Sequence, residues 1–201
     1  MRMRRRNLKK LPSILKEGGV ERVWLMDESR FGLKVYFRRR WCPYGWRPPW
    51  VYEDKYQWLW LYEAVDPLSG ESFSMLLPRV DCDCLRIFLK GFREEVGGEE
   101  KIGLILDNSP SHRSKMIDWS SLGIEPVYLP PYSPELNPVE LVFRELKGRL
   151  SNEVYGDLSE LEERICDELR GMKDEEGRLK IRFEGYRWLR EAIESIRARS
   201  K

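Results

Sequence analysis

Between Leu129 and Lys147 the sequence reads LPPYSPELNPVELVFRELK, a proline-rich turn that runs directly into a helix. We expect Asn137 and Pro138 as the N-cap and the first helical position, because proline fits where no intrahelical donor is needed. Apolar residues then recur at helical spacing as far as Leu150. Glu140 therefore falls in the first turn of a helix that packs against a core.

Two earlier apolar runs also end in a carboxylate: VWLM precedes Asp27, and IGLIL precedes Asp107. Continuous apolar runs of this length predict buried strands. Ligands in open α/β sheets usually bind at the carboxyl ends of the strands, so we expect Asp27 and Asp107 to meet at one edge. Glu140 would approach them from the helix packed beside that edge.

Such a trio suits phosphodiester chemistry. Mg²⁺ prefers oxygen ligands, and proteins usually give it a few carboxylates while water and phosphate complete the shell. Two Mg²⁺ ions about 3.5–4 Å apart can activate a nucleophilic oxygen and stabilise the leaving oxygen. The pattern predicts a site for two Mg²⁺ ions, with Mn²⁺ as a substitute, at Asp27, Asp107 and Glu140.

Each acid also has an ordinary structural explanation. An aspartate at a strand end often closes a turn. Glu140 lies three positions after Asn137 and completes a capping box in one interpretation, or pairs with Arg144 one helical turn later in another. The residues alone leave the catalytic and the structural interpretations open.

The rest of the chain predicts strands first and then strands that alternate with helices. Expected strands cover residues 22–29, 56–65, 71–77, 101–107 and 124–129, with 33–40 as a further strand or an extension of the first and 41–52 as a loop. Expected helices cover 85–96, capped by Asp81 or Asp83, a short one at 111–118, one opened by a Ser159/Glu162 capping box, and one from Tyr186 to Ile196 after a charged linker at 173–180. This order predicts an α/β fold, a mixed sheet covered by helices on both faces.

Composition narrows the class of protein. A length of 201 residues suits one domain, and the net charge is only +2. The first ten residues hold six basic residues and no acid, which is typical of an arm that meets nucleic acid or of a disordered tail. Four cysteines without a C-x-x-C pair and a single histidine, His112, argue against a zinc site and indicate a reducing cytosol. We find no apolar run long enough to cross a membrane and no signal peptide.

Four ordered motifs resemble those of mariner-superfamily transposases, in particular the bacterial and archaeal insertion-sequence branch. These are WLMDESRFGL at 24–33, WCPYGWRP at 41–48, DNSPSH at 107–112 and SPELNPVE at 133–140. Asp107 and Glu140 are 33 positions apart, close to the separation of the last two catalytic acids in that family. The resemblance covers about residues 20–150, and Val139 and Phe143 replace the more usual Ile and Trp.

The resemblance implies a ribonuclease H-like fold and a DDE catalytic domain whose metal-binding acids are Asp27, Asp107 and Glu140. Such enzymes cut the ends of a mobile element and join the freed 3′-hydroxyl to target DNA. It also implies DNA as partner, in a homodimer or larger complex that brings two ends together. We expect a basic arm at 1–20, the catalytic domain at 21–150 and a helical extension at 151–201.

The main departure from the family is at the N-terminus, where helix-turn-helix segments usually precede the catalytic domain. Only about 20 residues precede the first expected strand. We therefore expect recognition of the element ends to come from a separate helix-turn-helix chain or to be lost. Two alternatives follow: a stand-alone ribonuclease H-like nuclease, and a remnant that binds DNA or a partner without turnover.

Several residues are candidates for contact with DNA. Arg40, Trp41 and Arg47 combine charge with aromatic surface, as nucleic-acid surfaces do, or form a loop folded over the sheet. Arg144 and Lys147 share a helix flank with Glu140 and neutralise phosphates, or make ordinary ion pairs. His112 contacts phosphate, orders the site, or caps a local turn.

Overall fold

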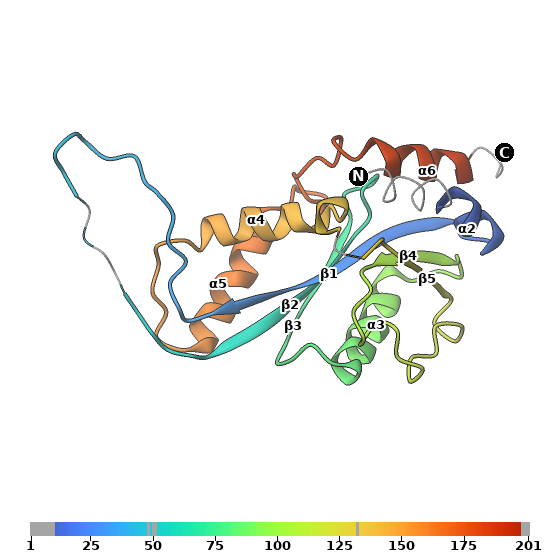
Figure 1. Cartoon of the computed structure of the whole chain (residues 1–201), viewed down its shortest axis with the longest axis horizontal. Coiled ribbons are helices and arrows are strands. Elements are labelled where there is room, and N and C mark those ends of the chain that lie inside the picture. Colours follow the sequence, from blue (N-terminus) through green and yellow to red (C-terminus); the bar gives the residue numbers. More distant parts are fainter. Residues whose placement is uncertain (1–10, 48, 50–51, 132, 198–201) are drawn as a thin grey trace.

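A mixed five-stranded sheet forms the centre of the computed structural model, which describes residues 11–47, 49, 52–131 and 133–197 (Figure 1). The strands lie in the order β3-β2-β1-β4-β5. They are β1 (Arg22–Gly32), β2 (Trp58–Val65), β3 (Ser72–Leu77), β4 (Ile102–Leu106) and β5 (Ile124–Tyr128). β1, β2 and β3 are antiparallel neighbours, whereas β4 and β5 run parallel to β1. The predicted α/β mixed sheet is confirmed.

Helices cover both faces of this sheet. The chain forms α2 (Leu11–Glu17), α3 (Cys82–Val96), a 3₁₀ turn η1 (Pro134–Leu136), α4 (Val139–Arg149), α5 (Leu158–Gly171) and α6 (Arg187–Arg197). Side chains alternate along a strand, so Leu25 of β1 enters the core beneath α4, α5 and α6, while Trp24 and Met26 enter the core beside α3. Figure 1 shows α4 and α3 on opposite sides of β1.

Two predicted elements are absent, and each has a local reason. Residues 33–40 are not a strand; β1 ends at Gly32, and Asn152 takes the backbone bonds instead, donating to Tyr36 O at 2.8 Å and accepting from Arg38 N at 3.1 Å. Residues 111–118 form turns rather than a helix. Serine side chains there bond to the local backbone, as Ser114 Oγ does with Met116 N at 3.2 Å, and this competes with helix formation.

The start of α5 also differs from the prediction. The capping box is formed by Asp157 and Glu160, not by Ser159 and Glu162: Asp157 Oδ1 accepts from Glu160 N at 2.9 Å, and Glu160 Oε2 accepts from Gly156 N at 2.6 Å. The carboxylate before the helix satisfies a donor that Ser159, already inside the helix, does not reach.

Asp157→Ala is therefore expected to destabilise the domain by about 1 kcal/mol, because loss of the cap leaves the amide of Glu160 without its hydrogen-bond acceptor. Chemical denaturation of Asp157→Ala and the wild type measures the difference in the free energy of unfolding. Ser159→Ala is the matched control and should unfold like the wild type. A larger loss of stability in Ser159→Ala than in Asp157→Ala would contradict the cap assignment.

The ends of the chain bear on the expected domain limits. Residues 1–10, which carry the basic block, lie outside the described residues. Residues 11–17 form α2, and Leu15 is buried in the same core as α5 and α6. The division into arm, catalytic domain and extension stays a prediction. Among the described helices, none combines the length and apolar character that a membrane span requires.

Candidate active site

Asp27 lies mid-way along β1 rather than at its end, and Asp107 directly follows β4, the parallel neighbour of β1. The pairing of β1 with β4 ends at Leu25 and Ile105, and Asp27 and Asp107 each follow that pair by two positions. Leu25 and Ile105 both enter the core under α4. Because every second side chain shares a face, Asp27 belongs to the face of β1 that α4 covers. Asp107 lies just beyond β4, where its Oδ1 contacts His112.

Glu140 faces this pair from the first turn of α4. Burial, together with the charges of Glu28, Glu140 and Asp107, raises the pKa of Asp27 from 3.8 to about 7, against the lowering effect of a hydrogen bond from Glu28 N. Like charges affect one another in this way only when they are close. The fold thus brings the first acid within the electrostatic reach of the other two.

Asn137 fastens Asp27 to the start of α4. Its Nδ2 donates to Met26 O at 2.9 Å and to Asp27 Oδ2 at 3.1 Å, and its Oδ1 accepts from Val139 N at 3.2 Å. Helix α4 begins at Val139 with Pro138 in the cap position, one residue later than expected. The buried amide of Asn137 therefore does more than cap a helix, because it joins the strand of one acid to the helix of another.

The three carboxylates of Asp27, Asp107 and Glu140 can be compared with the ligands that a magnesium site needs. Within the described ranges, no three acidic, histidine or cysteine side chains form a preformed set around one ion. Mg²⁺ is usually held by one or two carboxylates with waters and substrate phosphates, and two adjacent aspartates facing a glutamate supply such pairs. A cation beside Asp27 would also offset the cost of keeping that carboxylate charged. The residues fit the ion chemically, and their assignment as ligands stays a prediction.

His112 lies beneath Asp107, away from solvent. Its side chain is 0% exposed, with Nδ1 2.7 Å from Asp107 Oδ1 and Nε2 3.0 Å from Glu28 Oε1. Burial lowers the pKa of His112, but its contacts with Asp107 and Glu28 outweigh burial and raise the pKa to about 10. The same imidazole lowers the pKa of Asp107. A side chain buried in this way is not placed to contact phosphate. Of the roles expected for His112, the one that agrees with its burial is ordering the site.

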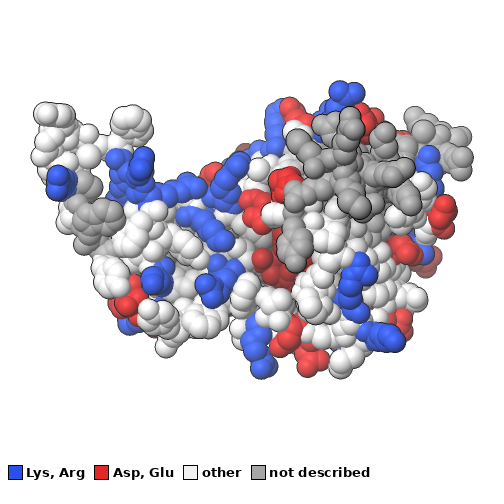
Figure 2. All heavy atoms as spheres, in the orientation of Figure 1, with Lys and Arg blue, Asp and Glu red and all other residues white. Residues whose placement is uncertain are grey.

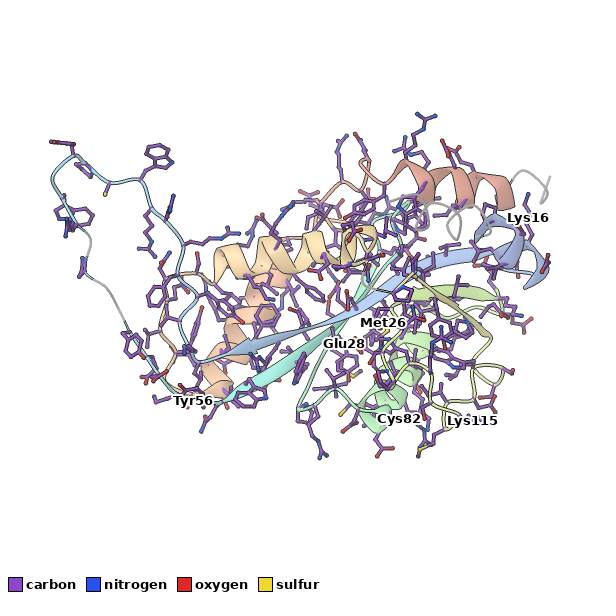
Figure 3. All side chains as sticks on the ribbon, in the orientation of Figure 1. Lys16, Met26, Glu28, Tyr56, Cys82 and Lys115 are labelled. Atoms are coloured by element: carbon purple, nitrogen blue, oxygen red, sulfur yellow. The ribbon has the colours of Figure 1, made fainter. Side chains whose placement is uncertain are left out.

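Sequence reasoning missed Glu28, which lies mid-way along β1 (Figure 3). Its neighbour Asp27 attracted attention because it ended an apolar run. The available signal was the second acid itself, since consecutive strand residues face opposite sides and two adjacent acids in a buried strand both need partners.

Comparison with known proteins places the chain in a family of nucleases. A sequence model described as DDE superfamily endonuclease matches residues 22–162. The chain belongs to this family. It is 30% identical over 110 residues to the Uncharacterized protein y4pE/y4sA of Sinorhizobium fredii (strain NBRC 101917 / NGR234), a match that covers 54% of this chain and 81% of that protein.

Solved structures show the fold of this DDE endonuclease. The Mos1 strand transfer complex matches with a TM-score of 0.65 at 18% identity, covering 96% of this chain and 58% of the Mos1 chain. The catalytic domain of Mos1 mariner transposase matches with a TM-score of 0.57 at 17% identity, covering 97% and 89%. The chain thus resembles ribonuclease H-like transposase catalytic domains and spans little more than half of the longer Mos1 chain.

An open groove in the DDE endonuclease runs past Glu140. Basic and aromatic side chains line it together with that acid: Arg38, Arg144, Lys147 and Tyr186. Lys147 is half-buried, with Nζ 5.5 Å from the centre of the Phe31 ring, and burial lowers its pKa. Figure 2 shows basic side chains gathered along the concave side of the molecule next to a group of acids.

The remaining DNA candidates lie on the loop between β1 and β2, which projects from the body of the molecule (Figure 1). Arg40 Nη2 donates to Asn152 O at 3.3 Å near its base. Trp41 is 105% exposed, and Arg47 is exposed. The loop is therefore not folded over the sheet, and its aromatic surface is open to a partner.

Proposed function

We propose that this DDE endonuclease domain is the catalytic part of a transposase, which cuts DNA at the ends of an element and joins the freed 3′-hydroxyl to target DNA. The observation that carries the proposal is that Asp27 lies within electrostatic reach of both Asp107, which follows the neighbouring strand, and Glu140, in the first turn of α4. Family membership and the transposase fold support the same chemistry. The likeness to the bacterial relative is consistent with the insertion-sequence branch.

Asp27, Asp107 and Glu140 would hold two Mg²⁺ ions, or Mn²⁺ in their place. When bound, such ions activate the nucleophilic oxygen and stabilise the leaving oxygen. Asn137 keeps Asp27 aimed at the start of α4 through its bond to Asp27 Oδ2. The N-terminal end of α4 favours a phosphate nearby, because the helix dipole attracts negative charge there.

The groove past Glu140 would take the DNA backbone, with Arg144 and Lys147 as phosphate contacts. The projecting loop would offer Arg40, Trp41 and Arg47 to DNA. Two element ends must be held together during transposition, which favours a homodimer or larger assembly; Mos1 has been solved as a paired-end complex. A separate helix-turn-helix chain would recognise the ends.

Lys147→Ala and Arg144→Ala are each expected to weaken binding of random-sequence duplex DNA and to reduce the slope of log affinity against log salt by about 1. Fluorescence anisotropy over a series of salt concentrations measures the slope. Lys90→Ala is the control, since Lys90 is exposed on α3 across the sheet. Equal slopes in all variants would place the DNA elsewhere.

The decisive assay offers a pre-cut DNA end with a free 3′-hydroxyl and a target duplex, in Mg²⁺ or Mn²⁺. The end sequence is sought as an inverted repeat in the DNA that flanks the gene. Joined product supports the transposase, provided that Asp107→Asn abolishes it. Hydrolysis without joining supports the stand-alone nuclease. Neither product, together with no uptake of metal in calorimetry, supports the non-catalytic remnant.

A further inference from the structure

Glu28 is a buried acid that the metal proposal leaves without a role. Its side chain is 7% exposed and belongs to the face of β1 opposite Asp27. A carboxylate removed from water is costly unless a hydrogen-bonding partner compensates it. The partner is His112, whose Nε2 lies 3.0 Å from Glu28 Oε1.

The imidazole of His112 continues this chain of contacts to Asp107. Nδ1 of His112 lies 2.7 Å from Asp107 Oδ1, and Tyr128 donates its hydroxyl to His112 O at 2.9 Å. Nε2 of His112 is thus hydrogen-bonded to Glu28 and its carbonyl accepts from Tyr128, while Nδ1 is in ion-pair contact with Asp107 without the alignment of a hydrogen bond. The ring has no freedom to turn without breaking the contact to Glu28 or to Asp107.

Asp107 needs such support more than Asp27 does. It is the first residue after β4, and its side chain is 55% exposed. Ser109 N donates to Asp107 Oδ1 at 2.8 Å, and His112 contacts the same oxygen. Both contacts use Oδ1, which keeps the Oδ2 atom available.

We propose that Glu28, acting through His112, is a positioning residue for Asp107. Glu28 fixes the ring, and the ring fixes one oxygen of Asp107, so that the other oxygen is presented to the metal. The inference rests on the proposed function, in which Asp107 is a ligand. Two consecutive residues of β1 would then serve one site. Asp27 would do so directly, and Glu28 would act from the opposite face of the sheet through His112.

The first test is the metal affinity of Glu28→Gln, which keeps the side-chain shape and removes the charge. Partners that orient a metal ligand typically change affinity by about 10–100-fold when lost, so we expect Mg²⁺ or Mn²⁺ to bind at least about tenfold more weakly. Calorimetry measures binding without any need for turnover. Circular dichroism checks that the variant is folded.

Tyr62→Phe is the matched control. Tyr62 is the register partner of Glu28 on β2, is equally buried, and donates its hydroxyl to Arg79 O rather than to the Asp107 chain of contacts. It should bind metal like the wild type. The inference is overturned if Glu28→Gln binds as tightly as the wild type while Asp107→Asn does not bind.

A second readout needs no metal. His112 is the only histidine, so nuclear magnetic resonance of the native sequence gives one set of ring signals. We expect a slowly exchanging Nδ1 proton in the wild type, and faster exchange together with a moved Asp107 carboxyl signal in Glu28→Gln but not in Tyr62→Phe. Unchanged Nδ1 exchange and an unchanged carboxyl signal would overturn the inference. Failure of the wild type to take up metal would instead count against the proposed function alone.

Discussion

Asp27→Asn is expected to abolish DNA cleavage and, at neutral pH and above, to make the folded domain more stable. In the proposed site Asp27 would hold metal together with Asp107 and Glu140, so the substitution would remove one of the three carboxylates. Metal ions contribute several kcal/mol of transition-state stabilisation. Because each 1.4 kcal/mol is a factor of ten, the rate should fall on the order of 1,000-fold or more.

The gain in stability follows from the pKa of Asp27. Its value in the folded state, about 7, lies above the ordinary 3.8, so the folded protein favours the protonated acid. Between these values the folded state binds more protons than the unfolded state, and stability falls as pH rises through about 7. The neutral asparagine does not incur this cost, which amounts to about 1.4 kcal/mol per unit of pKa difference.

Glu140→Gln is the contrasting variant. Glu140 is exposed, so its substitution should remove cleavage without a comparable gain in stability. Nicking assays measure activity, and urea denaturation at pH 5 and pH 8.5 measures stability. Retained cleavage in Asp27→Asn would end the assignment of this acid to the site, and a less stable Asp27→Asn at pH 8.5 would show that its charge is compensated.

Glu63→Gln should stabilise the domain increasingly as pH rises. Glu63 is 0% exposed, on β2 directly beside Asp27 in the register. Burial raises its pKa from 4.5 to about 8, against the lowering effect of the nearby Ser74 and Ser72 hydroxyls and of the Lys173 charge. Among the described residues, neither carboxylate oxygen of Glu63 has a hydrogen-bond partner. A fully buried carboxylate without adequate compensation favours its neutral form.

As for Asp27, the raised pKa of Glu63 makes the folded wild type less stable as pH rises, but over a different pH range. Below pH 4.5 both folded and unfolded forms of Glu63 are protonated, and Glu63→Gln should be nearly neutral. From there to about pH 8 the wild type loses stability because only its unfolded state releases the proton. At pH 9 the variant should therefore be a few kcal/mol more stable, on the scale of 1.4 kcal/mol per pKa unit.

Thermal and urea unfolding from pH 4 to pH 9 measures this difference. Glu99→Gln, at an exposed position after α3, is the control and should follow the wild type at every pH. A constant difference between Glu63→Gln and the wild type would show that Glu63 is charged in the fold, held by a compensating partner.

The strands and the main helices were predictable because their signals are local. The apolar runs before Asp27 and Asp107 indicated buried strands without knowledge of their neighbours, and both strands are present. The sequence after Pro138 likewise indicated α4 with Glu140 in its first turn. The error at residues 33–40 arose because a distant residue, Asn152, takes the backbone hydrogen bonds there. The error at Ser159 was local, since Asp157, two positions earlier, caps the helix instead.

The amino-acid order alone established the alternation of apolar runs, the acids at their ends and the helix that follows the proline-rich turn, because hydrophobic periodicity and capping depend on residues close in the chain. The tertiary structure alone decided which side chains meet. Glu28 and His112 are 84 positions apart, and Asn137 and Asp27 are 110 apart. Such contacts depend on strand register and on the face that each residue presents, and a shift of one position would send every side chain to the other side of the sheet.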